Sequence, residues 1–120
     1  AGFDLPIIRG LTGVSVEVRR DRARRVTILL DDLGDLAREV SEISVDVEGD
    51  LLVVLGGDGT VLKLAAPPFR NRVVSFLALR QELQERSPDA EYFDLRFKDR
   101  IYAKSASHDE IADLTRDASN

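Results

Sequence analysis

The chain has 120 residues, which is the length of one ordinary domain, and its 43% hydrophobic and 32% charged residues are typical of a globular fold. With 22 acidic against 17 basic residues the net charge is −5, which argues against non-specific binding to nucleic acid and against a polybasic membrane surface. The chain has no cysteine, which excludes a disulfide framework and a Cys-ligated metal site. Its only histidine is His108, which makes a Ser–His–Asp triad implausible.

The N-terminal half predicts an extended start followed by a strand and a helix. Residues 2–13 contain one proline and several glycines and are typical of an extended, turn-rich segment. Alternating apolar residues over 14–19 predict a short strand. From Asp21, a possible N-cap, apolar residues recur every three or four positions as far as Val40 and predict a helix, with a bend expected at Gly34.

The central part predicts three strands and a second helix. The strands are expected at residues 43–47, 51–55 and 60–64. Two glycine-containing turns, Gly49-Asp50 and Gly56–Gly59, separate them. The proline pair at 67–68 then starts a helix that ends near Ser87-Pro88.

The C-terminal part predicts a hairpin and a polar tail. Residues 92–97 and 101–104 are expected to form two strands joined by a tight turn at Lys98-Asp99. The acidic tail, residues 105–120, is expected either to be disordered or to form one helical turn around Ile111 and Leu114. The predicted fold is therefore α+β, a mainly antiparallel twisted sheet covered by two helices, in a single domain spanning residues 1–104 with a polar tail.

A glycine-rich loop offers one functional hypothesis. Residues 56–60, Gly56, Gly57, Asp58, Gly59 and Thr60, resemble the phosphate-binding loop of NAD kinases and diacylglycerol kinases, where backbone amides approach a phosphate. Such a loop should open a helix, yet only six residues separate Thr60 from the proline pair, and they alternate as a strand does. We therefore favour a plain hairpin turn, and a cofactor site in a kinase-like fragment is the alternative.

Two charged clusters are weaker candidates. Asp31, Asp32 and Asp35 suggest a metal site, but a solvated helix face is the better interpretation. Five arginines between Arg19 and Arg25 suggest contact with phosphate or an acidic partner, and an exposed helix start explains them equally well.

Three segments together resemble the bacterial cell-division family FtsQ, called DivIB in Gram-positive bacteria. Residues 89–104, Asp-Ala-Glu-Tyr-Phe-Asp-Leu-Arg-Phe-Lys-Asp-Arg-Ile-Tyr-Ala-Lys, look like the closing hairpin of the family's extracytoplasmic β domain. Residues 5–10, Leu-Pro-Ile-Ile-Arg-Gly, are similar to its Leu-Pro-x-x-x-Gly segment, with Arg9 in place of the usual threonine. Residues 43–64 resemble its strand–turn–strand core. The resemblance covers about residues 3 to 104.

The resemblance implies a divisome scaffold without catalysis, cofactor or metal, which binds the FtsB–FtsL pair through a C-terminal edge strand. It implies that Arg96 pairs with a partner carboxylate, that Phe97 and Tyr102 are apolar anchors, and that Asp99 and Arg100 flank the docking edge. Exposed sheet edges accept partner strands in general. The expected partner-binding residues are Arg96, Phe97, Asp99, Arg100, Ile101, Tyr102 and Lys104.

The resemblance also implies that the chain belongs to a longer, single-pass protein of the inner membrane. The family carries a transmembrane helix and a POTRA domain upstream, and here these and the first strands of the β domain are expected to be missing. The chain begins with Ala1 and contains no methionine, which fits a processed or excised segment, and it has no signal peptide and no run of roughly 18 apolar residues. The expected location is periplasmic, at the division septum. A generic α+β adaptor with another partner stays open as a third hypothesis.

Overall fold

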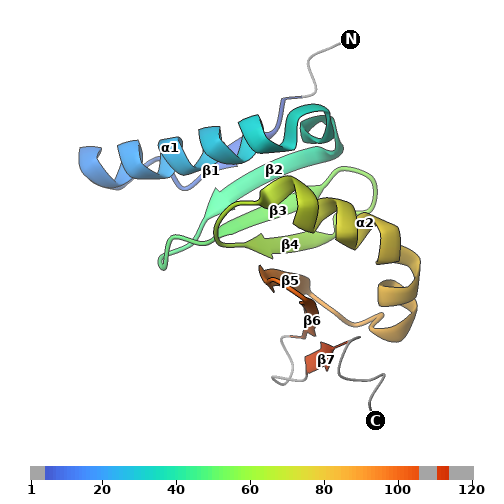
Figure 1. Cartoon of the computed structure of the whole chain (residues 1–120). Coiled ribbons are helices and arrows are strands. Elements are labelled where there is room, and N and C mark those ends of the chain that lie inside the picture. Colours follow the sequence, from blue (N-terminus) through green and yellow to red (C-terminus); the bar gives the residue numbers. More distant parts are fainter. Residues whose placement is uncertain (1–4, 106–110, 114–120) are drawn as a thin grey trace.

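A computed structural model describes residues 5–105 and 111–113 of the chain (Figure 1). Two long helices and a seven-stranded sheet, in the order β1-β2-β3-β4-β5-β6-β7, make up the fold. The elements are β1 (Ile7–Arg9), α1 (Val16–Leu33), the 3-10 helix η1 (Gly34–Glu39), β2 (Val40–Val45), β3 (Leu51–Leu55), β4 (Val61–Leu64), α2 (Phe69–Arg86), β5 (Tyr92–Phe97), β6 (Arg100–Lys104) and β7 (Ile111–Asp113).

The sheet is mainly antiparallel, and the predicted α+β class is confirmed. Strands β2–β3, β3–β4, β5–β6 and β6–β7 pair antiparallel. The exceptions are the pairs β1–β2 and β4–β5, which are parallel. Because parallel neighbours need a crossover connection, helix α2 joins β4 to β5 while α1 and η1 join β1 to β2.

The hydrophobic core lies between one face of the sheet and the two helices. Strands β2 to β4 bury alternate residues, so each presents one apolar face. On α2, Phe76 stacks against Phe93 of β5 with ring centroids 5.1 Å apart. The buried helical residues are Val26, Leu29 and Leu33 of α1 and Phe69, Val73, Phe76 and Leu83 of α2.

The prediction of a strand over residues 14–19 is wrong, because helix α1 already begins at Val16. The Ser15 hydroxyl caps this helix by accepting a hydrogen bond from the backbone N–H of Val18 at 3.2 Å. Val16 and Val18 are both exposed, so their alternation reflects no buried strand face. Asp21, the predicted N-cap, lies inside the helix and pairs with Arg25.

The predicted break at Gly34 is confirmed. Gly34 ends α1 with φ of 55°, a left-handed conformation that favours glycine. The chain continues as η1, so the prediction of a helix as far as Val40 is wrong, and Val40 begins β2.

The C-terminal part departs from the prediction at one place. Ile111–Asp113 forms strand β7, not a helical turn or a disordered segment, and it pairs with Tyr102–Lys104 of β6. Strand β6 is therefore not the edge of the sheet along these three residues, and the prediction of an unpaired edge there is wrong. His108 and Leu114 lie outside the described residues. Neither of the long helices in the described part of the chain is apolar enough to cross a membrane.

Candidate functional site

The hairpin of β5 and β6 gathers exposed aromatic and cationic side chains because β5 contains a bulge. The register shifts between Asp94 and Phe97, so β5 has one more residue than β6 over this stretch. The bulge places the Phe97 ring edge-on to Tyr102, with ring centroids 5.2 Å apart, and the Arg96 guanidinium 5.6 Å from the Phe97 ring centroid. Phe97 is nevertheless 46% exposed, so this cluster is available at the surface.

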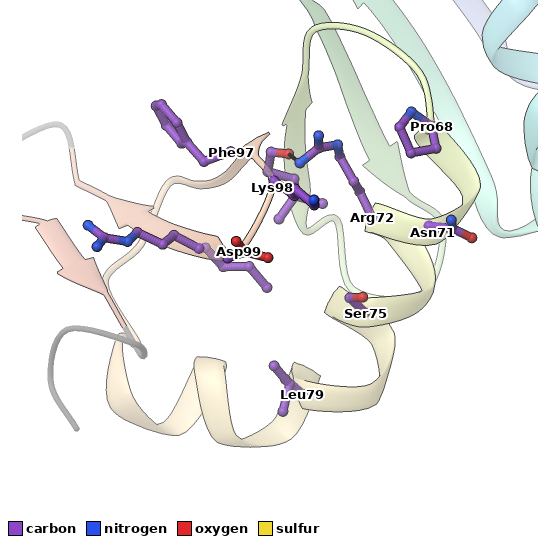
Figure 2. Close-up of a pocket in the computed structure, with 11 residues that line it drawn as sticks. Pro68, Asn71, Arg72, Ser75, Leu79, Phe97, Lys98 and Asp99 are labelled. Atoms are coloured by element: carbon purple, nitrogen blue, oxygen red, sulfur yellow. Dashed lines mark hydrogen bonds between the residues drawn. The ribbon is translucent and has the colours of Figure 1, made fainter. Parts of the chain in front are cut away.

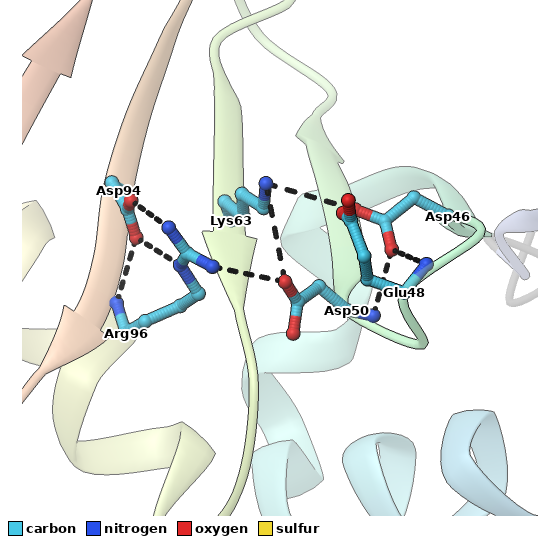
Figure 3. Close-up of polar contacts among 6 residues, drawn as sticks. All are labelled: Asp46, Glu48, Asp50, Lys63, Asp94 and Arg96. Atoms are coloured by element: carbon cyan, nitrogen blue, oxygen red, sulfur yellow. Dashed lines mark hydrogen bonds and ion pairs between the residues drawn. The ribbon is translucent and has the colours of Figure 1, made fainter.

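Arg96 is already held by carboxylates of its own chain (Figure 3). Its Nε and Nη2 donate to the two oxygens of Asp94 at 2.9 and 2.7 Å, and its Nη1 donates to Asp50 at 3.1 Å. Asp94 is completely buried, and its hydrogen bonds and charge raise the pKa of Arg96 above the ordinary arginine value. A partner carboxylate would therefore join an existing ion pair.

An acidic cluster beside this network contains the groups in the described residues that could ligate a metal. The carboxylates of Asp46, Glu48 and Asp50 lie within 4.8 Å of one another. The Lys63 ammonium lies 3.7 Å from Asp46 and 3.9 Å from Asp50, so the chain supplies its own cation to the cluster (Figure 3). Asp46 also accepts the backbone N–H groups of Glu48 and Asp50 and fixes the turn between β2 and β3. The cluster therefore has an evident structural role.

A groove of about 450 Å³ lies between α2 and the β5–β6 hairpin (Figure 2). Its apolar lining includes Leu95 and Ile101 of the hairpin and Leu79 of α2. Its remaining lining residues are Pro68, Asn71, Arg72, Ser75, Phe97, Lys98, Asp99 and Arg100, of which three are cationic and one is acidic.

The predicted site residues therefore occupy two adjoining places. Phe97, Asp99, Arg100 and Ile101 line the groove, and Arg96, Tyr102 and Lys104 lie elsewhere on the same hairpin. Sequence reasoning missed the groove, because its α2 wall is far from the hairpin in the chain. It also missed the partners of Arg96. The Asp94-x-Arg96 spacing was a usable signal, since residues two apart share one face of a strand.

The glycine-rich loop is a hairpin turn, as predicted. It joins the antiparallel strands β3 and β4, and the N–H of Leu55 donates to the carbonyl of Thr60 at 2.8 Å. No helix opens at Thr60, because Val61–Leu64 is strand β4. Asp58 accepts hydrogen bonds from Thr60, and its carboxylate lies 2.7 Å from the Arg80 guanidinium of α2. These contacts, the Thr60 hydroxyl first, lower the pKa of Asp58 below its ordinary value of 3.8.

The predicted aspartate cluster is not one site. The Asp32 carboxylate accepts the backbone N–H groups of Phe69 and Arg70, so it caps the start of α2, while Asp31 and Asp35 are exposed. Asp32 thus joins the end of α1 to the start of α2.

Three of the five clustered arginines have partners within the chain, and two of them hold the N-terminal segment in place. Arg19 and Arg22 donate to the carbonyls of Leu11 and Gly10 at 3.0 and 2.8 Å, and Arg25 pairs with Asp21 within α1. These bonds give three of the five arginines a structural role within the chain, without an external phosphate or acidic partner.

The fold is an α+β domain whose β5–β6 hairpin carries exposed aromatic and cationic side chains. Aromatic and arginine side chains, the types that dominate protein interfaces, surround a groove next to the last strands of the sheet.

A family model described as "Cell division protein FtsQ/DivIB, C-terminal" matches residues 1–96 of the 120. The chain therefore belongs to the C-terminal domain family of FtsQ/DivIB, and the resemblance found in the sequence is confirmed. The family has a role in cell division as a non-catalytic scaffold, and its C-terminal domain is an extracytoplasmic domain of a membrane protein. The match ends at Arg96, so most of the predicted docking residues lie beyond it. A search of curated proteins finds no match.

Proposed function

We propose that this domain is a non-enzymatic scaffold that recruits the FtsB–FtsL pair to the division septum through its β5–β6 hairpin. The observation that carries the proposal is the bulge in β5. It brings Arg96, Phe97 and Tyr102 together on one exposed surface at the end of the sheet. Membership in a family of division scaffolds supports the partner class.

Recognition would combine backbone and side-chain contacts. A strand of FtsB would add to β6 in place of β7, so that main-chain hydrogen bonds supply affinity. Alternate side chains of that strand would then point to opposite sides of the sheet. The partner side chains on one side of the sheet would contact Phe97 and Tyr102. Those on the other side would lie beside Ile101, which lines the groove.

The groove fits the side chains of the same partner because it is continuous with the hairpin. Phe97, Arg100 and Ile101 belong to both features. Arg72, Lys98 and Arg100 outnumber Asp99 among the charged lining residues, so acidic side chains next to apolar ones suit this surface. In this proposal Arg96 is a preorganised group, since Asp94 and Asp50 fix its orientation before the partner arrives.

The proposal is tested by measuring the affinity of the chain for the extracytoplasmic segment of the cognate FtsB with isothermal titration calorimetry. Phe97→Ala and Tyr102→Ala should each weaken binding by about tenfold or more, as expected for aromatic anchors. Val47→Ala is the control, because Val47 is 91% exposed in the turn between β2 and β3. Unchanged affinity in both aromatic variants would remove the hairpin from the interface.

A further inference from the structure

The place where a partner strand would add to β6 is partly filled by the chain itself. Strand β7 pairs antiparallel with β6, with Tyr102 opposite Asp113, Ala103 opposite Ala112 and Lys104 opposite Ile111. Backbone groups of these β6 residues are thus engaged on both sides, by β5 and by β7. A second strand cannot use the same side of β6 until β7 leaves.

The described pairing with β7 is shorter than β6 itself. Strand β6 has five residues, Arg100–Lys104, and the ladder with β7 takes in only the last three of them. A partner strand that ran antiparallel to β6 along its whole length would also reach Arg100 and Ile101. The partner would therefore pair with more of β6 than the three residues Ile111–Asp113 do, and it would displace β7.

We propose that β7 is a built-in competitor, which occupies the docking edge of β6 in the free domain and gives it up to an extended strand of the partner. This inference rests on the proposed function and adds a regulation to the same site. Because β7 follows β6 in the same chain, the competitor is always present at a high effective concentration. A site that is closed most of the time binds with an apparent affinity reduced by its open fraction.

The test compares tail variants of the 120-residue chain in binding the extracytoplasmic FtsB segment. The double variant Ala112→Pro/Asp113→Pro disrupts β7, because consecutive strand residues point their N–H groups to opposite sides and one of the two must face β6. The matched control, Ala118→Pro/Ser119→Pro, places the same prolines beyond β7. Affinity should increase about tenfold in the first variant and stay unchanged in the control.

A disulfide provides the opposite perturbation. Ala103 and Ala112 are directly paired, and Cα atoms in such pairs are close enough for a disulfide. The chain contains no other cysteine, so Ala103→Cys/Ala112→Cys can form only this bond within one molecule. Oxidation should lock β7 in place and weaken binding by at least tenfold, and reduction should restore it.

The outcomes separate this inference from the proposed function. Suppose that the partner binds the unmodified chain. Equal affinity in all tail variants, or weaker binding when β7 is disrupted, would then show that β7 is not a competitor. If neither the unmodified chain nor the β7-disrupted variant bound the segment, the proposed function would fail and this inference with it.

Discussion

Replacing Arg96 with methionine should destabilise the domain more than replacing its partner Asp94 with asparagine. The two residues form one ion pair, but their surroundings differ. Asp94 is completely buried, whereas the Arg96 side chain is 31% exposed and also contacts Asp50. The cost of removing one partner depends on what is left behind, because a buried charge without a counter-charge is strongly unfavourable.

The expected magnitudes follow from this asymmetry. In Arg96→Met, Asp94 keeps only the hydrogen bond from the backbone N–H of residue 96, at 3.1 Å in the native chain, and loses both guanidinium donors. The expected loss is about 3–5 kcal/mol in the free energy of unfolding. In Asp94→Asn, Arg96 keeps Asp50 at 3.1 Å and partial contact with solvent, so we expect about 1–3 kcal/mol.

The assay is urea unfolding at pH 7 followed by circular dichroism. Arg20→Met is the matched control, because Arg20 is exposed on α1, and it should change the free energy of unfolding by less than about 0.5 kcal/mol. Equal losses in Arg96→Met and Asp94→Asn would refute the reasoning, since they would mean that the burial of Asp94 does not set the cost. A loss below about 1 kcal/mol in both would mean that the pair is not a structural element.

Three further predictions concern the caps and the β3–β4 turn, each measured by unfolding. Asp32→Ala removes the cap of α2 and should cost about 1–2 kcal/mol, while exposed Asp31→Ala should cost little; equal effects would contradict the capping role. Ser15→Ala should cost about 1 kcal/mol by removing the cap of α1, and no loss would mean that the helix start is fixed by other contacts. The lowered pKa of Asp58 predicts stability that is fully present above the ordinary aspartate pKa and is lost as pH falls through the folded-state pKa. The difference between native chain and Asp58→Asn should therefore shrink below about pH 4, and a difference independent of pH would contradict it.

The local elements were largely predictable, because their signals lie within a few residues. Strands β3 and β4 and their turn follow from alternation and from Asp58-Gly59, and the proline pair marks the start of α2. The start of α1 was missed because the alternation over residues 14–19 obscured the cap at Ser15.

The tertiary contacts of the site could not be read from the sequence in the same way. Asp50 reaches Arg96 from 46 residues away, and the meeting depends on the parallel pairing of β4 with β5. The groove likewise needs α2 and the hairpin to be placed against each other. The pairing of β7 with β6 was hidden because the polar, acidic tail has no strand-like alternation.

The most direct test of the docking account is an NMR titration of the isotope-labelled chain with the extracytoplasmic segment of the cognate FtsB. The account predicts saturable shifts of backbone amides in β5 and β6, residues 92–104, and no response at residues 56–60 in the β3–β4 turn. MgATP and NAD, added separately, should leave both regions unchanged. Silence of the hairpin with the segment, or nucleotide-induced shifts at residues 56–60, would contradict it.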